Sequence, residues 1–148
     1  MRGIKGFTLI ELLIAISIIA VLSTLAMITF ANFQKNARDA KRQSDLNIVK
    51  SALEQYHSDK KNYPRNVVFD GESSIINGTR TYLSKVPLDP NNGTETQYCY
   101  EGSGTCSADG CTKYVLYTKL ENGTTDDFTC AVLDSTPVSG YNLKVTPP

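Results

Sequence analysis

The sequence has no surplus of charge, almost no histidine and no recognisable nucleotide-binding motif. Its 148 residues include 15 Lys+Arg and 15 Asp+Glu, and the pI is near 6.6. The lack of a basic surplus argues against a dedicated nucleic-acid binder. The single histidine, His57, has no Ser, Cys or carboxylate obviously held beside it, so we expect a solvated residue and no enzyme active site. No G-x-G-x-x-G or Walker pattern occurs, and no cofactor is expected.

All four cysteines lie in the final third of the chain. They are Cys99, Cys106, Cys111 and Cys130. An even number in a small polar region predicts disulfides formed in an oxidising compartment. No C-x-x-C spacing occurs, which disfavours a zinc site. Four cysteines allow three pairings; we favour Cys106 with Cys111 across the intervening turn, and Cys99 with Cys130 between strands.

Two further motifs are interpreted as solvated turns. An acidic stretch matches no EF-hand loop, so no metal is expected there; it contains Glu121, Asn122, Asp126 and Asp127. Three Asn-Gly-Thr sequons begin at Asn77, Asn92 and Asn122. We expect Asn-Gly turns at these positions and no glycosylation.

The amino-terminal segment is strongly apolar. Residues 1–6 are short and basic, and from Phe7 to Phe33 the only ionisable side chain is Glu11. Residues 12–31, as a helix, span a hydrocarbon core of roughly 30 Å. The stretch is too long for the apolar region of a secretory signal, and no convincing A-x-A site follows it. We therefore expect a membrane helix that stays on the mature chain.

Glu11 is unusual because a carboxylate near hydrocarbon is costly and generally has a partner. Thr8-Leu9-Ile10-Glu11 fits the capping box that opens a helix before an apolar run. In this interpretation Glu11 only satisfies free backbone N–H groups at the headgroup level.

The whole string Gly6-Phe7-Thr8-Leu9-Ile10-Glu11-Leu12-Leu13 resembles the signature of type IV prepilins and pseudopilins. The resemblance implies cleavage between Gly6 and Phe7 by a prepilin peptidase, and N-methylation of Phe7. It also implies that Glu11 pairs with the amine of Phe7 on a neighbouring subunit, with Thr8 beside it. In a low dielectric such a pair offsets the desolvation of both charges only when it forms.

The sequence departs from the family at two positions within the apolar segment. Many pilins have a helix-breaking Gly and Pro there, where this chain has Ala20 and Ile28, so we expect a more continuous helix. Counting basic residues on either side of the span weakly favours an orientation opposite to the family's. We keep the family's orientation, because oxidised cysteines require the outside.

The helix is expected to continue as an amphipathic segment over residues 33–63. Leu46, Val49, Leu53 and Tyr56, with Ala37 and Ala40 before them, form an apolar stripe, and charged residues are expected on the opposite face. Tyr63-Pro64 is expected to end the helix. The basic cluster of residues 35–42 is expected to lie at lipid headgroups.

Beyond the helix, residues 65–95 are expected to form loops, and strands are expected at residues 96–101, 113–121, 128–133 and 141–145, with a hairpin turn at Asn122-Gly123. The predicted fold is α+β: a long amino-terminal helix, half membrane-spanning and half amphipathic, packed on a small antiparallel sheet. The expected parts are a leader (1–6), a transmembrane and filament-core helix (7–32), its amphipathic continuation (33–63) and a globular head (64–148).

The resemblance implies a structural subunit of an extracellular type IV pilus-like filament that serves adhesion, motility or DNA uptake. Its expected partners are other copies of the chain, the prepilin peptidase, the pilus assembly machinery and the membrane. Nucleic acid is not required. The precursor is expected in the cytoplasmic membrane and the mature chain in an extracellular pilus. The alternatives are a pseudopilin of a type II secretion system and a membrane-tethered binding module.

Overall fold

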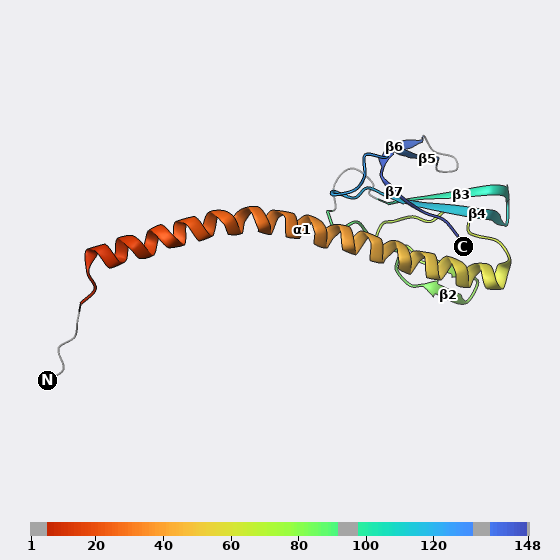
Figure 1. Cartoon of the computed structure of the whole chain (residues 1–148). Helices are drawn as coiled ribbons and strands as arrows, with labels where there is room; N and C mark the ends of the chain where they lie inside the picture. The colour runs from red at the N-terminus through yellow and green to blue at the C-terminus, as the bar shows by residue number, and fades with distance from the viewer. Residues whose placement is uncertain (1–5, 92–97, 132–136, 148) are drawn as a thin grey trace. The chain divides into compact units, whose positions relative to one another are not determined.

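The computed structural model describes residues 6–91, 98–131 and 137–147 (Figure 1). Helix α1 (Leu9–Lys60) is followed, within these residues, by seven strands: β1 (Ile75–Asn77), β2 (Arg80–Leu83), β3 (Tyr98–Ser107), β4 (Gly110–Thr118), β5 (Phe128–Cys130), β6 (Val138–Tyr141) and β7 (Leu143–Val145). This order confirms the predicted α+β class. The chain divides into two compact units, Met1–Lys35 and Asn36–Pro148, which are described separately.

Helix α1 runs without a break through Ala20 and Ile28, as its lack of Gly and Pro predicts. It ends at Lys60, slightly earlier than expected. The next residue, Lys61, adopts a left-handed conformation with φ of 60°, and its N–H donates to the carbonyl of His57 over 2.8 Å. A left-handed residue of this kind terminates a helix. Lys61 therefore stops α1 before Tyr63-Pro64 is reached.

The main sheet of the second unit has the order β3-β4-β7, and both pairings are antiparallel. Strands β3 and β4 form a hairpin around Ala108-Asp109. The expected hairpin at Asn122-Gly123 is wrong. The N–H groups of Glu121 and Asn122 instead donate to the carboxylate of Asp39 over 2.8 and 2.9 Å, so this loop folds back onto α1.

Two small hairpin-like pairs accompany the main sheet. Strands β1 and β2 pair around a turn that contains Gly78, whose φ is +58°. This pair corrects the expectation that all of residues 65–95 are loop. Strands β5 and β6 pair with each other, so the strand expected over residues 141–145 is split between β6 and β7. Parts of the strands expected at 96–101 and 128–133 lie outside the described residues.

The core of the second unit lies between α1 and the main sheet. Leu46, Val49 and Leu53 are fully buried, and Tyr114 and Leu116 of β4 are among the residues that pack with them. This confirms that part of the predicted apolar stripe. Burial of such side chains is the main favourable contribution to folding.

The prediction is wrong for the amino-terminal end of the apolar stripe. Ala37 and Ala40 are exposed, and the buried positions on this part of α1 are Asp39, Arg42 and Asp45. The prediction placed all charged residues on the opposite face. It failed because two loops supply carboxylates, Asp89 and Glu121, that form salt bridges with the buried Arg42.

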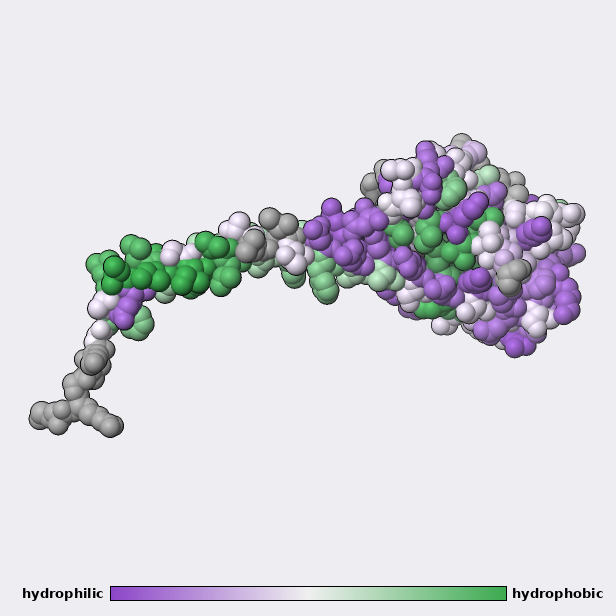
Figure 2. All heavy atoms as spheres, in the orientation of Figure 1, coloured by the Kyte–Doolittle hydropathy of each residue, from purple (hydrophilic) through white to green (hydrophobic). Residues whose placement is uncertain are grey.

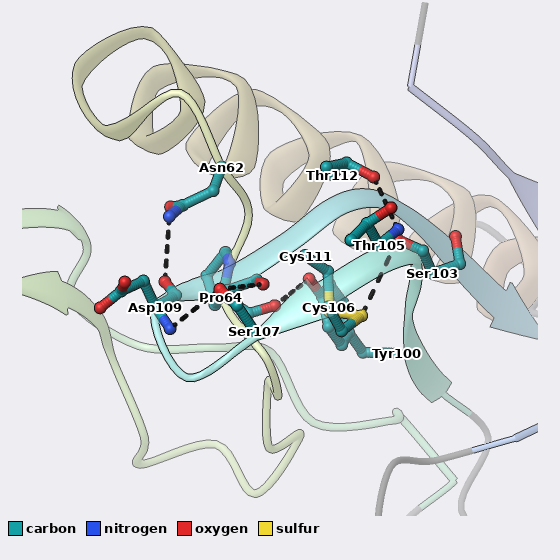
Figure 3. The surroundings of a disulfide bond; sticks show 11 residues. Asn62, Pro64, Tyr100, Ser103, Thr105, Cys106, Ser107, Asp109, Cys111 and Thr112 are labelled. Carbon is teal, nitrogen blue, oxygen red and sulfur yellow. Dashed lines mark hydrogen bonds between the residues drawn. A yellow bond between two sulfur atoms is a disulfide. The ribbon is translucent and has the colours of Figure 1, made fainter.

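The structure contains disulfides Cys99–Cys130 and Cys106–Cys111, the pairs that the sequence analysis favoured. Figure 3 shows the second disulfide at the tip of the β3–β4 hairpin. There the N–H of Cys111 donates to the carbonyl of Tyr63 over 2.9 Å, and the carbonyl of Cys111 accepts from the N–H of Tyr63 over 2.8 Å. The side chain of Asn62 donates to the carbonyl of Asp109 over 3.0 Å. The segment that follows α1 is thereby attached to the hairpin tip.

Candidate functional site

The first turn of α1 has reciprocal hydrogen bonds between Thr8 and Glu11. The backbone N–H and the hydroxyl of Thr8 donate to Oε2 of Glu11 over 2.9 and 2.7 Å, and the N–H of Glu11 is 3.3 Å from Oγ1 of Thr8. This is a capping box, which satisfies N–H groups that have no partner within the helix. Both donors use the same carboxylate oxygen.

The other two residues of the predicted processing site lie directly before this cap. Gly6 has open space around its Cα, because a Cβ added there would meet nothing within 4 Å. Phe7 is 84% exposed. The structure therefore brings Phe7, Thr8 and Glu11 together at the start of one helix, next to an accessible Gly6–Phe7 peptide bond.

The first unit has an apolar surface that is covered by nothing within the described residues. Figure 2 shows this surface as a green stretch. The large apolar side chains from Leu9 to Phe33 that the structure describes are between 51% and 81% exposed. By length and composition α1 contains a segment able to cross a membrane. The hydroxyls of Ser17 and Thr24 donate to the carbonyls of Ile14 and Ala20, so these polar groups do not require water.

The second unit contains a buried ionic cluster that the sequence analysis did not predict. Arg42 donates to Asp89 over 2.7 Å, to Asp39 over 2.8 Å and to Glu121 over 3.1 Å. Arg38 also holds Glu121, through two bonds of 2.5 and 2.6 Å. The prediction that these basic residues lie at headgroups is therefore wrong for Arg42, whose side chain is only 1% exposed. Asp39 and Arg42 are spaced i, i+3 and lie on the same helix face as Leu46. This spacing could have predicted that the two charged side chains are buried.

The cluster favours the charged forms of Glu121 and Arg42. The hydrogen bond from Arg38, reinforced by Arg42, lowers the pKa of Glu121 to about 2. Burial alone lowers the pKa of Arg42, but the carboxylates of Asp89, Glu121 and Asp39 raise it above its ordinary value. A buried charge is tolerated only when it is paired in this way. The cluster fixes two loops to α1.

His57 is less solvated than the sequence predicted. It is half-buried and stacks on Tyr63, with ring centroids 4.5 Å apart. Tyr63 and Tyr114 both donate their hydroxyls to Glu54, the latter over 2.9 Å. His57 and the tyrosines near it therefore pack together at the carboxyl-terminal end of α1. Among the described residues, no three His, Cys, Asp or Glu side chains gather as a metal site would require.

Comparison with known proteins identifies the amino-terminal segment. The family model described as "Prokaryotic N-terminal methylation motif" matches residues 1–27, which include Gly6, Phe7, Thr8 and Glu11. No solved structure matches the chain.

Similarity to whole proteins extends beyond this segment, over about 60–67% of the chain. The type IV wide pilus major component PilA4 of Thermus thermophilus is 32% identical over 67% of this chain and 72% of its own length. The fimbrial protein EcpC of Eikenella corrodens is 30% identical over 62% of this chain, which spans 60% of that relative. The type II secretion system core protein G of Escherichia coli is 28% identical over 58% of this chain and 66% of its own length. With its capped, apolar amino-terminal helix and an α+β second unit, the chain belongs to the type IV pilin family.

Proposed function

We propose that the chain is a structural, non-enzymatic subunit of an extracellular type IV pilus-like filament. The precursor is held in the cytoplasmic membrane by residues 7–32, loses residues 1–6 to a prepilin peptidase, and is methylated at Phe7. Residues 33–63 continue the helix into the head formed by residues 64–148. The observation that carries the proposal is the apolar amino-terminal half of α1, which begins at a capped Glu11 and needs either lipid or protein around it.

Assembly replaces lipid with protein contacts along this helix. In the filament the Glu11 carboxylate of one copy pairs with the amine of Phe7 on its neighbour. The Thr8 bonds occupy Oε2, and within the described residues Oε1 accepts no hydrogen bond. The cap and the pairing between copies are therefore compatible, and one carboxylate serves both.

Two matched variants separate these roles. Thr8→Val removes the hydroxyl of the cap and keeps the Glu11 charge, whereas Glu11→Gln keeps an acceptor for Thr8 and removes the charge. If the pairing between copies directs assembly, Glu11→Gln loses filaments and Thr8→Val retains them. Sheared filaments are quantified by electron microscopy and immunoblot, with subunit levels in the membrane as the control. The opposite pattern would reduce Glu11 to a helix cap.

Processing is tested independently of assembly. Gly6→Ala is expected to leave the precursor uncut, with the bond before Phe7 intact. Mass spectrometry of the wild-type subunit is expected to show an amino terminus at methylated Phe7. A wild-type filament subunit that still begins at Met1 would refute the processing step while leaving the filament itself in place.

A second candidate is a pseudopilin of a type II secretion system, favoured by the similarity to the core protein G of Escherichia coli. A membrane-tethered binding module that never polymerises is a third. Surface filaments whose subunit yields peptides of this chain support the pilin. A chain required for protein secretion, with no surface filaments, supports the pseudopilin. A chain that stays monomeric in the membrane supports the binding module.

A further inference from the structure

We propose that the Cys106–Cys111 disulfide is a site of thiol–disulfide exchange, attacked at Cys106, and that its opening loosens the tip of the β3–β4 hairpin. The reactant is a small molecule that carries one or two thiol groups. The other disulfide, Cys99–Cys130, stays closed under the same conditions. The inference goes beyond the proposed function, because it concerns a covalent reaction of the head and holds whether or not the chain forms filaments.

The two disulfides differ in their exposure to solvent. Cys106 is exposed, as is every other residue from 104 to 109. Cys99 and Cys130 are only 5% and 0% exposed. A thiol reacts with a disulfide only where it reaches a sulfur, and exposed disulfides are accordingly the labile or regulatory ones. Accessibility therefore favours reaction at Cys106–Cys111.

The hairpin determines which sulfur of this bond a thiolate reaches. Cys106 on β3 and Cys111 on β4 are directly opposite each other, and the bond crosses the hairpin between them (Figure 3). A thiolate approaches a sulfur along the S–S bond, from the side away from the sulfur that leaves. For Cys106 this side lies beyond β3, which is the edge strand of the main sheet within the described residues.

The opposite approach, to the sulfur of Cys111, is closed. Cys111 is 0% exposed. On the side of β4 away from β3, its backbone pairs with that of Tyr63 through two hydrogen bonds. The residue after α1 therefore covers the path to Cys111, and attack is expected at Cys106.

The exchange balances between the thiol and the chain. The thiolate sulfur forms a bond to Sγ of Cys106, the bond from Cys106 to Cys111 breaks, and Cys111 leaves as a thiolate that takes a proton from water. A monothiol stays on Cys106 as a mixed disulfide. The second thiolate of a dithiol attacks the reagent's own sulfur in that mixed disulfide and releases Cys106. The dithiol is then oxidised to a disulfide, and the chain has gained two electrons and two protons.

Cys99–Cys130 provides a control within the same chain. Its two cysteines form a second buried cluster with Tyr117 and Tyr141, against which Phe128 also packs. A thiolate reaches this bond only after the head has opened locally, and such openings are rare in a packed core.

Opening Cys106–Cys111 is expected to affect the contact between the hairpin tip and the end of α1. The pairing of β3 with β4 is irregular between Ser103 and Cys106, and only two residue pairs lie beyond this irregularity. Cys111 belongs to one of these pairs and also holds Tyr63 through its backbone. The disulfide is the covalent link across this short tip, so without it the tip and the contact with Tyr63 open more often.

The first test maps the exchange on the wild-type chain. The chain, folded in detergent, is incubated with reduced glutathione, quenched with acid, unfolded and alkylated with N-ethylmaleimide. Mass spectrometry of tryptic peptides is expected to find glutathione on Cys106 and N-ethylmaleimide on Cys111. The peptides of residues 86–113 and 120–144 are expected to remain joined by Cys99–Cys130.

The expected rates make this test decisive. Cys106–Cys111 is expected to open at least about tenfold faster than Cys99–Cys130. The double variant Cys106→Ser, Cys111→Ser is the control, because it retains only the buried disulfide and is expected to take up no glutathione over the same time. Equal rates at the two bonds, or glutathione mainly on Cys111, would overturn the inference.

The second test measures what the opening does and needs no substitution. Hydrogen exchange is followed by NMR in the wild-type chain before and after treatment with glutathione. The amides of Tyr63 and Cys111 are expected to exchange at least about tenfold faster after treatment. The amide of Leu116, on β4 beyond the irregularity, is expected to stay within about twofold of its untreated rate. Unchanged exchange at Tyr63 and Cys111, with glutathione bound to Cys106, would refute the loosening of the tip.

Discussion

The guanidinium of Arg42 lies buried against the carboxylate of Asp89, with Nε 2.7 Å from Oδ2 and a second nitrogen 3.2 Å from Oδ1. The side chains are only 1% and 7% exposed. This two-point contact joins α1 to the segment that follows β2, across 47 positions of the chain. Asp39 adds a second link, because it accepts both from Arg42 and from the backbone of the loop after β4.

Arg42→Met is therefore expected to destabilise the head by about 3–5 kcal/mol, because it leaves Asp39 and Asp89 buried without their counter-charge. The measurement is urea denaturation of the detergent-solubilised chain followed by tyrosine fluorescence. Arg38→Met is the control: Arg38 is 30% exposed and contacts only Glu121 in this cluster, so we expect a clearly smaller loss of stability than in Arg42→Met. Equal losses in the two variants would contradict a special role for burial.

The same cluster predicts how stability depends on pH. The pKa of Glu121 is lowered from 4.5 to about 2 by Arg38 and Arg42. The folded state therefore binds fewer protons than the unfolded state between these values, so its stability is present above about pH 4.5 and is lost as the pH falls toward 2. Thermal unfolding across this range should show a shallower loss for Glu121→Gln. Part of the pH dependence of stability is expected to remain in this variant, because hydrogen bonds from Ser73 and Glu72 also lower the pKa of Asp70 to about 2. If stability depended on pH equally in Glu121→Gln and wild type, the ion pairs of Glu121 with Arg38 and Arg42 would contribute nothing to stability.

Much of the fold was predictable from local sequence patterns. The absence of Gly and Pro predicted that α1 is one unbroken helix, and the spacing of Leu46, Val49 and Leu53 predicted its buried face from Leu46 onward. The capping motif at Thr8 and Glu11 is contained within four residues and was predicted with its partners. These features depend on neighbours in sequence.

The features that the sequence did not reveal depend on partners far along the chain. Asp39 and Arg42 were assigned to the solvated face, because their partners Asp89 and Glu121 lie in loops without periodicity. Asn122-Gly123 has the composition of a hairpin turn, but the N–H of Asn122 donates to the carboxylate of Asp39. This hydrogen bond holds the loop against α1, so the hairpin does not form. In both cases a tertiary contact overrides a correct local preference.

The two disulfides are expected to contribute unequally to stability. When a disulfide acts by restricting the unfolded chain, its contribution grows with the length of the closed loop, and the cysteines are separated by 31 and 5 residues. Replacing Cys99 and Cys130 by Ser is expected to cost about 4 kcal/mol, and replacing Cys106 and Cys111 about 2 kcal/mol. Urea midpoints of the two double variants, compared with wild type under non-reducing conditions, give the order. A larger loss from the Cys106 and Cys111 pair would mean that fixing the hairpin tip to Tyr63 matters more than loop length.

Gly110 and Gly78 provide a final test of how the head holds the end of α1. Both have positive φ, +142° and +58°. A Cβ on Gly78 meets nothing within 4 Å, so Gly78→Ala is expected to cost only the left-handed strain, about 1 kcal/mol. A Cβ on Gly110 would lie 2.3 Å from the carbonyl oxygen of Tyr63. Since that carbonyl accepts from Cys111, Gly110→Ala is expected to separate the hairpin tip from the segment after α1 and to cost about 3 kcal/mol or more. Denaturation curves measure both costs, and faster hydrogen exchange at Tyr63 and Cys111 in Gly110→Ala alone would locate the damage. Similar costs in both variants would show that the hairpin tip does not depend on this close approach.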